Sequence, residues 1–324
     1  MVHLRIVVPA ELVSRVLDTL ERSAAVSHLV HLPGAARRPP GDVVLCDVAR
    51  EAASIVLLDL EELGVPEHGA IAVERPATVI SRAADRAERA APGDPANAVV
   101  WEEVEKLTSE STDLSASYLI FMTLSTLIAS VGIFLDTPIL IIGAMVLGPE
   151  FGPLASFCVA VVQGRRALAR RSLVALVAGF PLGIGAAFVA SLLFKWTGIT
   201  PDQFNEQSHG LSAIISNPDF FSFFVAFCAG VAGMLSLTTS KSGALTGVLI
   251  SVTTIPAAAN IGVSAAYGDW SAFGGSVAQL GINLVALCIA GVGTLFVQRE
   301  IFLRRRAEHM RNHAELPGSG GPRC

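Results

Sequence analysis

One acidic side chain, Glu150, interrupts a stretch of the chain that is otherwise apolar. A carboxylate near the middle of a bilayer costs about 2.5–3.5 kcal/mol even on the insertion scale, so such a group faces a cavity, carries a proton or forms a pair. One interpretation is a site for a cation or a proton, with Glu150 as the ligand or the titrating group. The alternatives are that Glu150 caps free backbone amides at a broken helix, or that it pairs at a subunit interface. The neighbours that we include in the candidate site are Gly148, Pro149, Gly152 and Pro153.

A second set of polar residues surrounds a proline further along the chain, where Thr253 and Thr254 precede Pro256. Proline removes a backbone donor and frees a carbonyl about one turn earlier, and lipid cannot satisfy such groups. We therefore expect a helix end here that coordinates an ion or a polar solute. Hydrogen bonds between neighbouring helices are the alternative role for polar side chains of this kind. The other strongly polar side chains that we include in the site are Asn260, Gln279 and Asn283.

These residues lie in apolar runs, each of which has the roughly 20 residues that a helix needs to cross a bilayer. Only 16% of the chain is charged, whereas about 25% is usual for a soluble protein. The deficit is concentrated in residues 113–298, which hold 7 acidic and 6 basic side chains. We predict an α-helical polytopic membrane protein with about six spans. The runs are 114–135, 138–163, 172–194, 220–240, 242–266 and 271–298.

The second and fifth runs follow the same pattern, and each is the middle member of a triplet of runs. Each begins near a Gly-Ala pair, breaks at a proline and ends with a glycine beside a charged residue, at Gly164-Arg165 and Gly268-Asp269. Because three spans is an odd number, a duplicated triplet must have inverted topology. Broken helices at matching positions of inverted halves point to a transporter binding site. We predict such a 3+3 repeat, the alternative being two ordinary proline kinks.

The first 75 residues are patterned like a small soluble domain. Short β-branched runs alternate with two amphipathic segments in the order β-α-β-β-α-β, which is typical of a ferredoxin-like domain. We expect this domain to be cytoplasmic and regulatory, with a basic loop that contains Arg37 and Arg38 between its second and third strands. The predicted domains are the ferredoxin-like domain at 1–75, a linker and juxtamembrane helix at 76–112, the six-span domain at 113–298 and a basic tail at 299–324.

The charges in the loops predict the orientation of the spans. Four arginines, at 165, 166, 170 and 171, lie between the second and third runs, and six more follow residue 298. The positive-inside rule then places both termini in the cytoplasm of a multi-pass protein in the cell membrane. Glycines in the last run, Gly281, Gly291 and Gly293, favour a homo-oligomer because they permit close helix contacts. We expect no cofactor and no nucleic-acid partner, and no pair of the five cysteines forms the CxxC spacing of a zinc site.

The membrane domain resembles the DUF389 family of prokaryotic membrane proteins over roughly residues 114–297. Many relatives carry Ser-Pro-Leu-Met-Gly-Pro where this chain has Gly-Pro-Glu-Phe-Gly-Pro at 148–153, so the resemblance implies that Glu150 belongs to a subgroup and has no role shared by the whole family. The family name denotes unknown function, so the resemblance implies an architecture and no substrate. The matching segments are Tyr118-Leu119-Ile120, Ile141-Ile142-Gly143-Ala144-Met145, Gly152-Pro153, Ile255-Pro256-Ala257, Gly268-Asp269 and Asn283-Leu284-Val285.

Three functional classes are compatible with this sequence, and the first is expected. It is a transporter or channel for a small solute or ion, with the site at the broken second and fifth spans. The second is a membrane-anchored sensor or scaffold without transport activity. The third is an intramembrane enzyme, which we do not expect because the sequence has no HExxH, no GxSxG and no pair of intramembrane aspartates. Glu150 stands alone in the apolar runs, so it has no partner residue for general acid–base catalysis.

Overall fold

The chain forms two compact units, the first comprising Met1–Val104 with Gln298–Cys324 and the second Glu105–Val297. The structure is a computed structural model that describes residues 1–74, 76, 78–91, 104, 108, 113–200, 210–239 and 253–314, with side chains as far as 304. Most of the predicted juxtamembrane helix and the first part of the predicted fifth span, residues 242–252, therefore lie outside the described residues.

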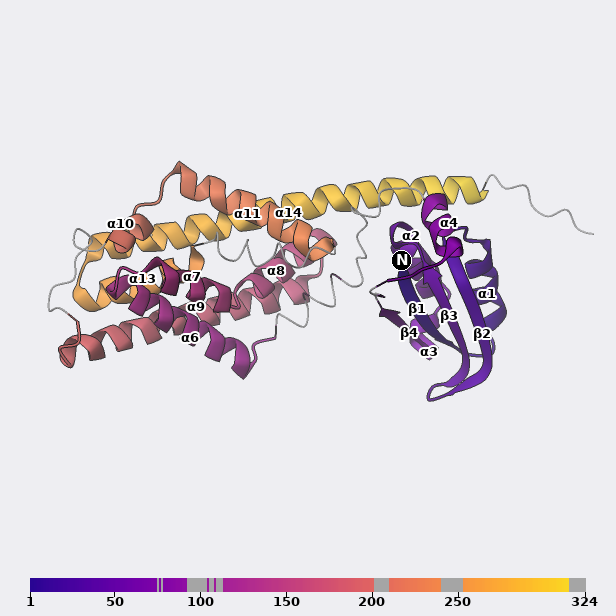
Figure 1. Ribbon diagram of the computed structural model, residues 1–324, viewed down its shortest axis with the longest axis horizontal. Helices are drawn as coiled ribbons and strands as arrows, with labels where there is room; N and C mark the ends of the chain where they lie inside the picture. The colour runs from indigo at the N-terminus through magenta and orange to yellow at the C-terminus, as the bar shows by residue number, and fades with distance from the viewer. Residues whose placement is uncertain are drawn as a thin grey trace, which may run out of the picture. The chain divides into compact units, whose positions relative to one another are not determined.

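The N-terminal unit contains a four-stranded antiparallel sheet with the strand order β2-β3-β1-β4 (Figure 1). Its element order is the predicted β-α-β-β-α-β, with a short helix, α3, inserted before the last strand. The alternation of apolar residues in β1 places every second side chain on the buried face of the sheet. The elements are β1 Val2–Val8, α1 Val13–Arg22, β2 Val26–Arg37, β3 Pro40–Val48, α2 Arg50–Glu62, α3 Val65–His68 and β4 Ala70–Glu74.

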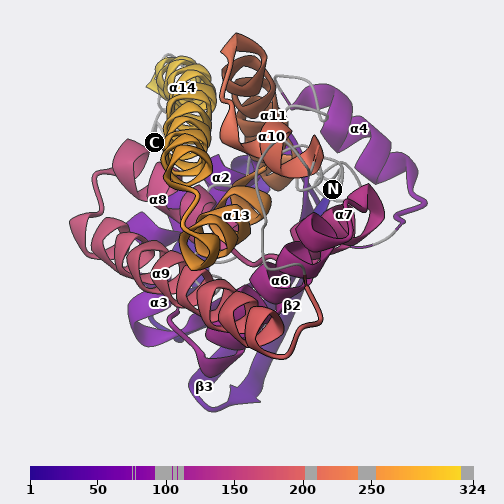
Figure 2. The same ribbon diagram turned by 90° about the vertical axis from the view of Figure 1, so that its left-hand side faces the viewer.

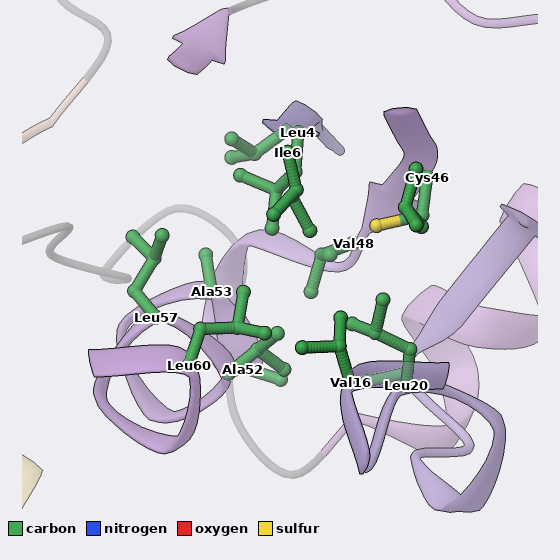
Figure 3. Close-up of a cluster of buried hydrophobic side chains, with 14 of the residues drawn as sticks. Leu4, Ile6, Val16, Leu20, Cys46, Val48, Ala52, Ala53, Leu57 and Leu60 are labelled. Atoms are coloured by element: carbon green, nitrogen blue, oxygen red, sulfur yellow. The ribbon is translucent and has the colours of Figure 1, made fainter. Parts of the chain in front are cut away.

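The core of this unit lies between the buried face of the sheet and the helices α1 and α2 (Figure 3). Leu4 and Ile6 of β1 are fully buried there, and the two helices present the apolar faces that the 3.6-residue period predicts. The labelled side chains in Figure 3 are Leu4, Ile6, Val16, Leu20, Cys46, Val48, Ala52, Ala53, Leu57 and Leu60.

The predicted basic loop between the second and third strands is wrong. Strand β2 continues to Arg37 and β3 begins at Pro40, so the segment is a hairpin. A shift of register between Leu32 and Ala36 marks a bulge, which accommodates a proline because β2 is an edge strand. Gly34 has a φ of +61° there, and its backbone N–H donates to Asp42 Oδ1 at 2.8 Å.

Part of the predicted linker is a helix, α4, which spans Arg82–Ala90. Its N-cap is Ser81, whose hydroxyl oxygen accepts a hydrogen bond from the backbone N–H of Ala83 at 3.1 Å. The same oxygen lies 2.7 Å from Nε2 of His28, and the other ring nitrogen of His28 lies 2.7 Å from Asp47 Oδ2. This chain of hydrogen bonds ties the start of α4 to the sheet.

The second unit is helical, and four of its described helices are long and apolar enough to cross a membrane. The bent pair α7 and α8 brings the number to five if it is counted as one span. The prediction of six spans stays a prediction, because the fifth run is described only from residue 253. The helices are α6 Ala116–Phe134, α7 Pro138–Leu147, α8 Phe151–Gln163, α9 Arg166–Trp196, α10 Gly210–Ser216, α11 Phe220–Thr238, α13 Thr254–Tyr267 and α14 Trp270–Ala314.

Small residues allow the helices of this unit to approach closely (Figure 2). A Cβ on Gly262 of α13 would lie 2.6 Å from the carbonyl oxygen of Ile184 in α9. A Cβ on Gly291 of α14 would lie 2.9 Å from Cys158 Sγ of α8. Gly291 therefore serves packing within the chain, which corrects its assignment to an oligomer interface, whereas Gly281 and Gly293 face open space.

The buried thiol of Cys46 provides a test of the N-terminal fold. Burial, with a smaller contribution from the charge of Asp47, raises the pKa of this thiol to about 12. The reactive thiolate is then scarce at neutral pH. In a variant whose other cysteines are alanine, we expect maleimide labelling at pH 7.5 to be at least about 100-fold slower than in denaturant. Equal rates in the two conditions would contradict the packing of β3 against α1.

Candidate functional site

The break between α7 and α8 is formed by Gly148, Pro149 and Glu150, and the two helices meet at a bend of 49°. Gly148 has an extended backbone with φ −62° and ψ 128°, as expected for a residue before proline. The position has no room for a side chain, because an added Cβ would lie 2.7 Å from Cγ1 of Ile255 and would also collide with the Glu150 carboxylate. Gly148 thus brings the break directly against α13.

The second interruption is the start of α13. Thr253 is its N-cap, and the Thr253 carbonyl accepts a hydrogen bond from the N–H of Ala257 at 3.2 Å. Pro256 is the third residue of α13, just as Pro153 is the third residue of α8. Because the first N–H groups of a helix have no partner within it, neither proline breaks a hydrogen bond. The expected release of carbonyls by these two prolines is therefore wrong, and the helices begin there instead.

The two interruptions are in direct contact. The hydroxyl of Thr254 donates a hydrogen bond of 2.7 Å to Glu150 Oε1, between residues that are 1% and 6% exposed. Glu150 is the N-cap residue of α8, but its side chain makes no capping hydrogen bond. The interpretation of Glu150 as a cap for free backbone amides is therefore wrong, and its carboxylate points toward α13.

A second layer of polar side chains comes from one face of α14. Asn283 Nδ2 donates to the Thr253 hydroxyl oxygen at 2.9 Å, and Gln279 Nε2 donates to the same oxygen at 3.3 Å. Gln279 Nε2 also donates to Asn283 Oδ1 at 3.2 Å. The predicted residues Thr253, Gln279 and Asn283 therefore form one hydrogen-bonded group next to Glu150 and Thr254.

Two buried oxygens of this group accept no hydrogen bond from the described residues, namely Glu150 Oε2 and Gln279 Oε1. An unsatisfied buried acceptor costs about 1–3 kcal/mol, and more for a charged group. Oxygen ligands of this kind suit a proton or a hard cation rather than a soft metal. Among the described residues, no group of three or more His, Cys, Asp or Glu side chains is arranged to hold a metal ion.

Asn260 does not join this group. Its Oδ1 accepts a hydrogen bond of 3.0 Å from the hydroxyl of Ser212 in α10, and its Nδ2 donates to Ser276 Oγ of α14 at 2.8 Å. All three residues are completely buried. Asn260 therefore links three helices, about two turns along α13 from Thr253.

The sequence analysis missed Ser212 and Ser276. Serine in an apolar helix usually bonds its own backbone and carries little signal. One signal was present, because Ser276, Gln279 and Asn283 are spaced at i, i+3 and i+7 and so share one face of a helix. That spacing indicates a polar stripe that faces α13.

The described residues thus form a mostly helical protein with four long apolar helices and one bent pair, α7 and α8. Residues 145–289, which include every predicted site residue, match the family model described as "Domain of unknown function (DUF389)". This match covers 145 of the 324 residues and is consistent with the resemblance to the DUF389 family that the motifs indicated.

A relative in Methanocaldococcus jannaschii, named as an uncharacterized protein, is 28% identical over 196 residues. The alignment covers 60% of this chain and 58% of the relative, so the chain spans less than two thirds of that protein's length. No solved structure matches the chain.

The close contact at Gly148 yields a prediction about stability. Gly148→Ala should destabilise the protein by about 1–3 kcal/mol, because the added methyl group overpacks the contact with Ile255. Gly143→Ala is the matched control in the same helix, since a Cβ there meets nothing within 4 Å. Thermal unfolding in detergent should show a lower Tm for Gly148→Ala alone. An unchanged Tm for both variants would contradict the contact between the break and α13.

Proposed function

We propose that the chain is a multi-pass membrane protein that transports or conducts a small solute or ion, with a cation or proton held at Glu150. The observation that carries this proposal is the pair of buried oxygens, Glu150 Oε2 and Gln279 Oε1, that accept no hydrogen bond from any residue that the structure describes. They lie where the broken span meets the start of α13. A transiently bound proton or cation would neutralise the Glu150 carboxylate and would bind its free oxygen, Oε2.

The chemistry favours a positively charged occupant. The group contains one carboxylate and several neutral oxygens, from Thr253, Thr254, Gln279 and Asn283. No described lysine or arginine is hydrogen-bonded or paired to any of them. Because an ionised carboxylate in an apolar bundle is unstable without a counter-charge, the site binds the cation that neutralises it.

The local structure of α8 and α13 supports the proposed inverted repeat. Each helix has a proline at its third residue, and each ends at a glycine in the left-handed region, Gly164 with φ +72° and Gly268 with φ +74°. The backbone N–H after each glycine donates to a carbonyl five residues earlier, from Arg165 to Ala160 at 2.9 Å and from Asp269 to Ser264 at 3.0 Å. These are the same C-terminal motif.

The flanking helices extend the correspondence. Helices α6 and α11 both have 19 residues. Each has a side-chain N-cap, since Ser115 Oγ accepts from the N–H of Tyr118 at 3.1 Å and Asp219 Oδ1 accepts from the N–H of Ser222 at 2.8 Å. In the proposed repeat, α6 to α9 and α11 to α14 are the two halves. The interruptions then lie at equivalent places, where transporters of inverted design bind their substrates.

The proposal includes the orientation of the helices. Arginines at 165 and 166 precede or begin α9, whereas its last turn carries only Lys195. The positive-inside rule places the start of α9 at the cytoplasmic surface. Both termini and the N-terminal domain then lie in the cytoplasm, where that domain would act as a regulatory unit.

Ion flux into proteoliposomes tests the proposal. We expect the full-length chain to carry protons, sodium or rubidium ions above the background of protein-free liposomes. Glu150→Gln should reduce that flux by about tenfold or more, because it removes the carboxylate charge from the candidate site. Glu300→Gln is the matched control, since this exposed residue pairs with Arg304 outside the candidate site.

Two results would argue against transport at this site. Equal flux for the wild type and Glu150→Gln would exclude the carboxylate as a ligand. Background flux of the wild type across these cations and a panel of metabolites would favour the alternative, a membrane-anchored sensor or scaffold.

A further inference from the structure

A hollow of about 440 Å³ lies beside the starts of α6 and α9, and none of its lining residues belongs to the Glu150 group. Its walls come from the residues just before α6 and from the first turns of α9. On α9 the lining residues are spaced at i, i+3, i+4 and i+7, so they form one face of the helix. The lining residues are Asp113, Leu114, Ala167, Arg170, Arg171 and Val174.

Buried contacts hold the two walls in place. The hydroxyl of Tyr118, in the first turn of α6, donates to the carbonyl oxygen of Ala175 in α9 at 3.1 Å. Its ring lies against Gly179, where an added Cβ would be 3.0 Å from a ring carbon. Tyr118 is 6% exposed. Asp113 and Leu114 are therefore positioned against Arg170 by a packed contact between the helices.

The two arginines give the hollow its chemistry. Both Arg170 and Arg171 are exposed, and neither guanidinium forms an ion pair or hydrogen bond within the part of the chain that the structure describes. A guanidinium binds phosphate oxygens in a bidentate manner. Because the two arginines exceed the single carboxylate of Asp113, the described lining of the hollow has a net positive charge.

The surface next to the arginines is apolar. Val174 is 48% exposed, and Val177, one turn further along the same face of α9, is 63% exposed. Leu114 forms an apolar edge on the opposite wall and is 48% exposed. A ligand that binds both the arginines and the apolar side chains has a phosphate group at one end and a hydrocarbon chain at the other.

We propose that this hollow binds the headgroup of an anionic phospholipid, with an acyl chain along Val174 and Val177. The proposal goes beyond transport and requires only that α9 lies in a bilayer. Basic pockets between membrane helices bind anionic headgroups in this way. Asp113 selects among such lipids, because its carboxylate accepts hydrogen bonds from the glycerol hydroxyls of phosphatidylglycerol and repels the dianionic phosphate of phosphatidic acid.

Native mass spectrometry of the full-length chain in detergent tests this inference with three lipids. The wild type should bind phosphatidylglycerol about tenfold or more tightly than phosphatidylcholine, and more tightly than phosphatidic acid. Arg170→Gln with Arg171→Gln should abolish the preference for phosphatidylglycerol over phosphatidylcholine. The matched control is Arg86→Gln with Arg89→Gln, which removes the same charge from exposed positions of α4 and should leave binding unchanged. Asp113→Asn should abolish the preference for phosphatidylglycerol over phosphatidic acid.

The wild-type measurement decides the matter even if a variant fails to fold. No preference of the wild type for phosphatidylglycerol over phosphatidylcholine would overturn the proposal. Equal binding by the wild type and the Arg170/Arg171 variant would also overturn it. Displacement of bound lipid by millimolar inorganic phosphate would assign the hollow to a soluble phosphate instead and would reject the lipid.

Discussion

A polar group inside an apolar helix bundle has no water to bond with, so the chain itself must supply its partner. This constraint governs the centre of the helical unit. The break after Gly148 and the start of α13 each bury polar groups. The two are joined by the hydrogen bond from the Thr254 hydroxyl to the Glu150 carboxylate. Gly148 is required because any side chain there would separate the two interruptions.

The same constraint explains the polar stripe on α14. Gln279 and Asn283 satisfy Thr253, and Ser276 satisfies Asn260, so the stripe bonds to α13 over its first two turns. The buried oxygens that accept no hydrogen bond from the described residues then indicate where a ligand could bind. Within the described part of the chain, Thr253 and Asn283 accept hydrogen bonds, whereas one carboxylate oxygen of Glu150 and the amide oxygen of Gln279 accept none. The stripe therefore accounts for packing, and the open acceptors are what favour a bound ion.

The sequence predicted the elements better than it predicted their contacts. Apolar length located the long helices, and alternation located the strands, because both depend only on neighbours in the chain. The pairing of Glu150 with Thr254 joins residues 104 positions apart, and nothing in the local pattern distinguishes Thr254 from Thr253. Asn260 lies on the same face of α13 as Thr253 but about two turns further along, where it bonds to Ser276 and Ser212, and helical periodicity does not show which of these partners each residue meets. The hairpin after Leu32 was missed because Pro33-Gly34 resembles a loop signal, although an edge strand tolerates both residues.

The two halves of the proposed repeat differ at the N-cap residue of the helix that follows each interruption. Glu150 and Thr253 hold equivalent positions, each the N-cap residue three before a proline. One half therefore has a carboxylate at this position and the other a hydroxyl, and the next hydroxyl along the chain, that of Thr254, donates to the carboxylate at 2.7 Å. Two carboxylates at this distance would repel each other in an apolar environment and would need two counter-charges. A glutamate opposite threonines requires only one counter-charge, which agrees with the single monovalent cation or proton that we propose as the occupant.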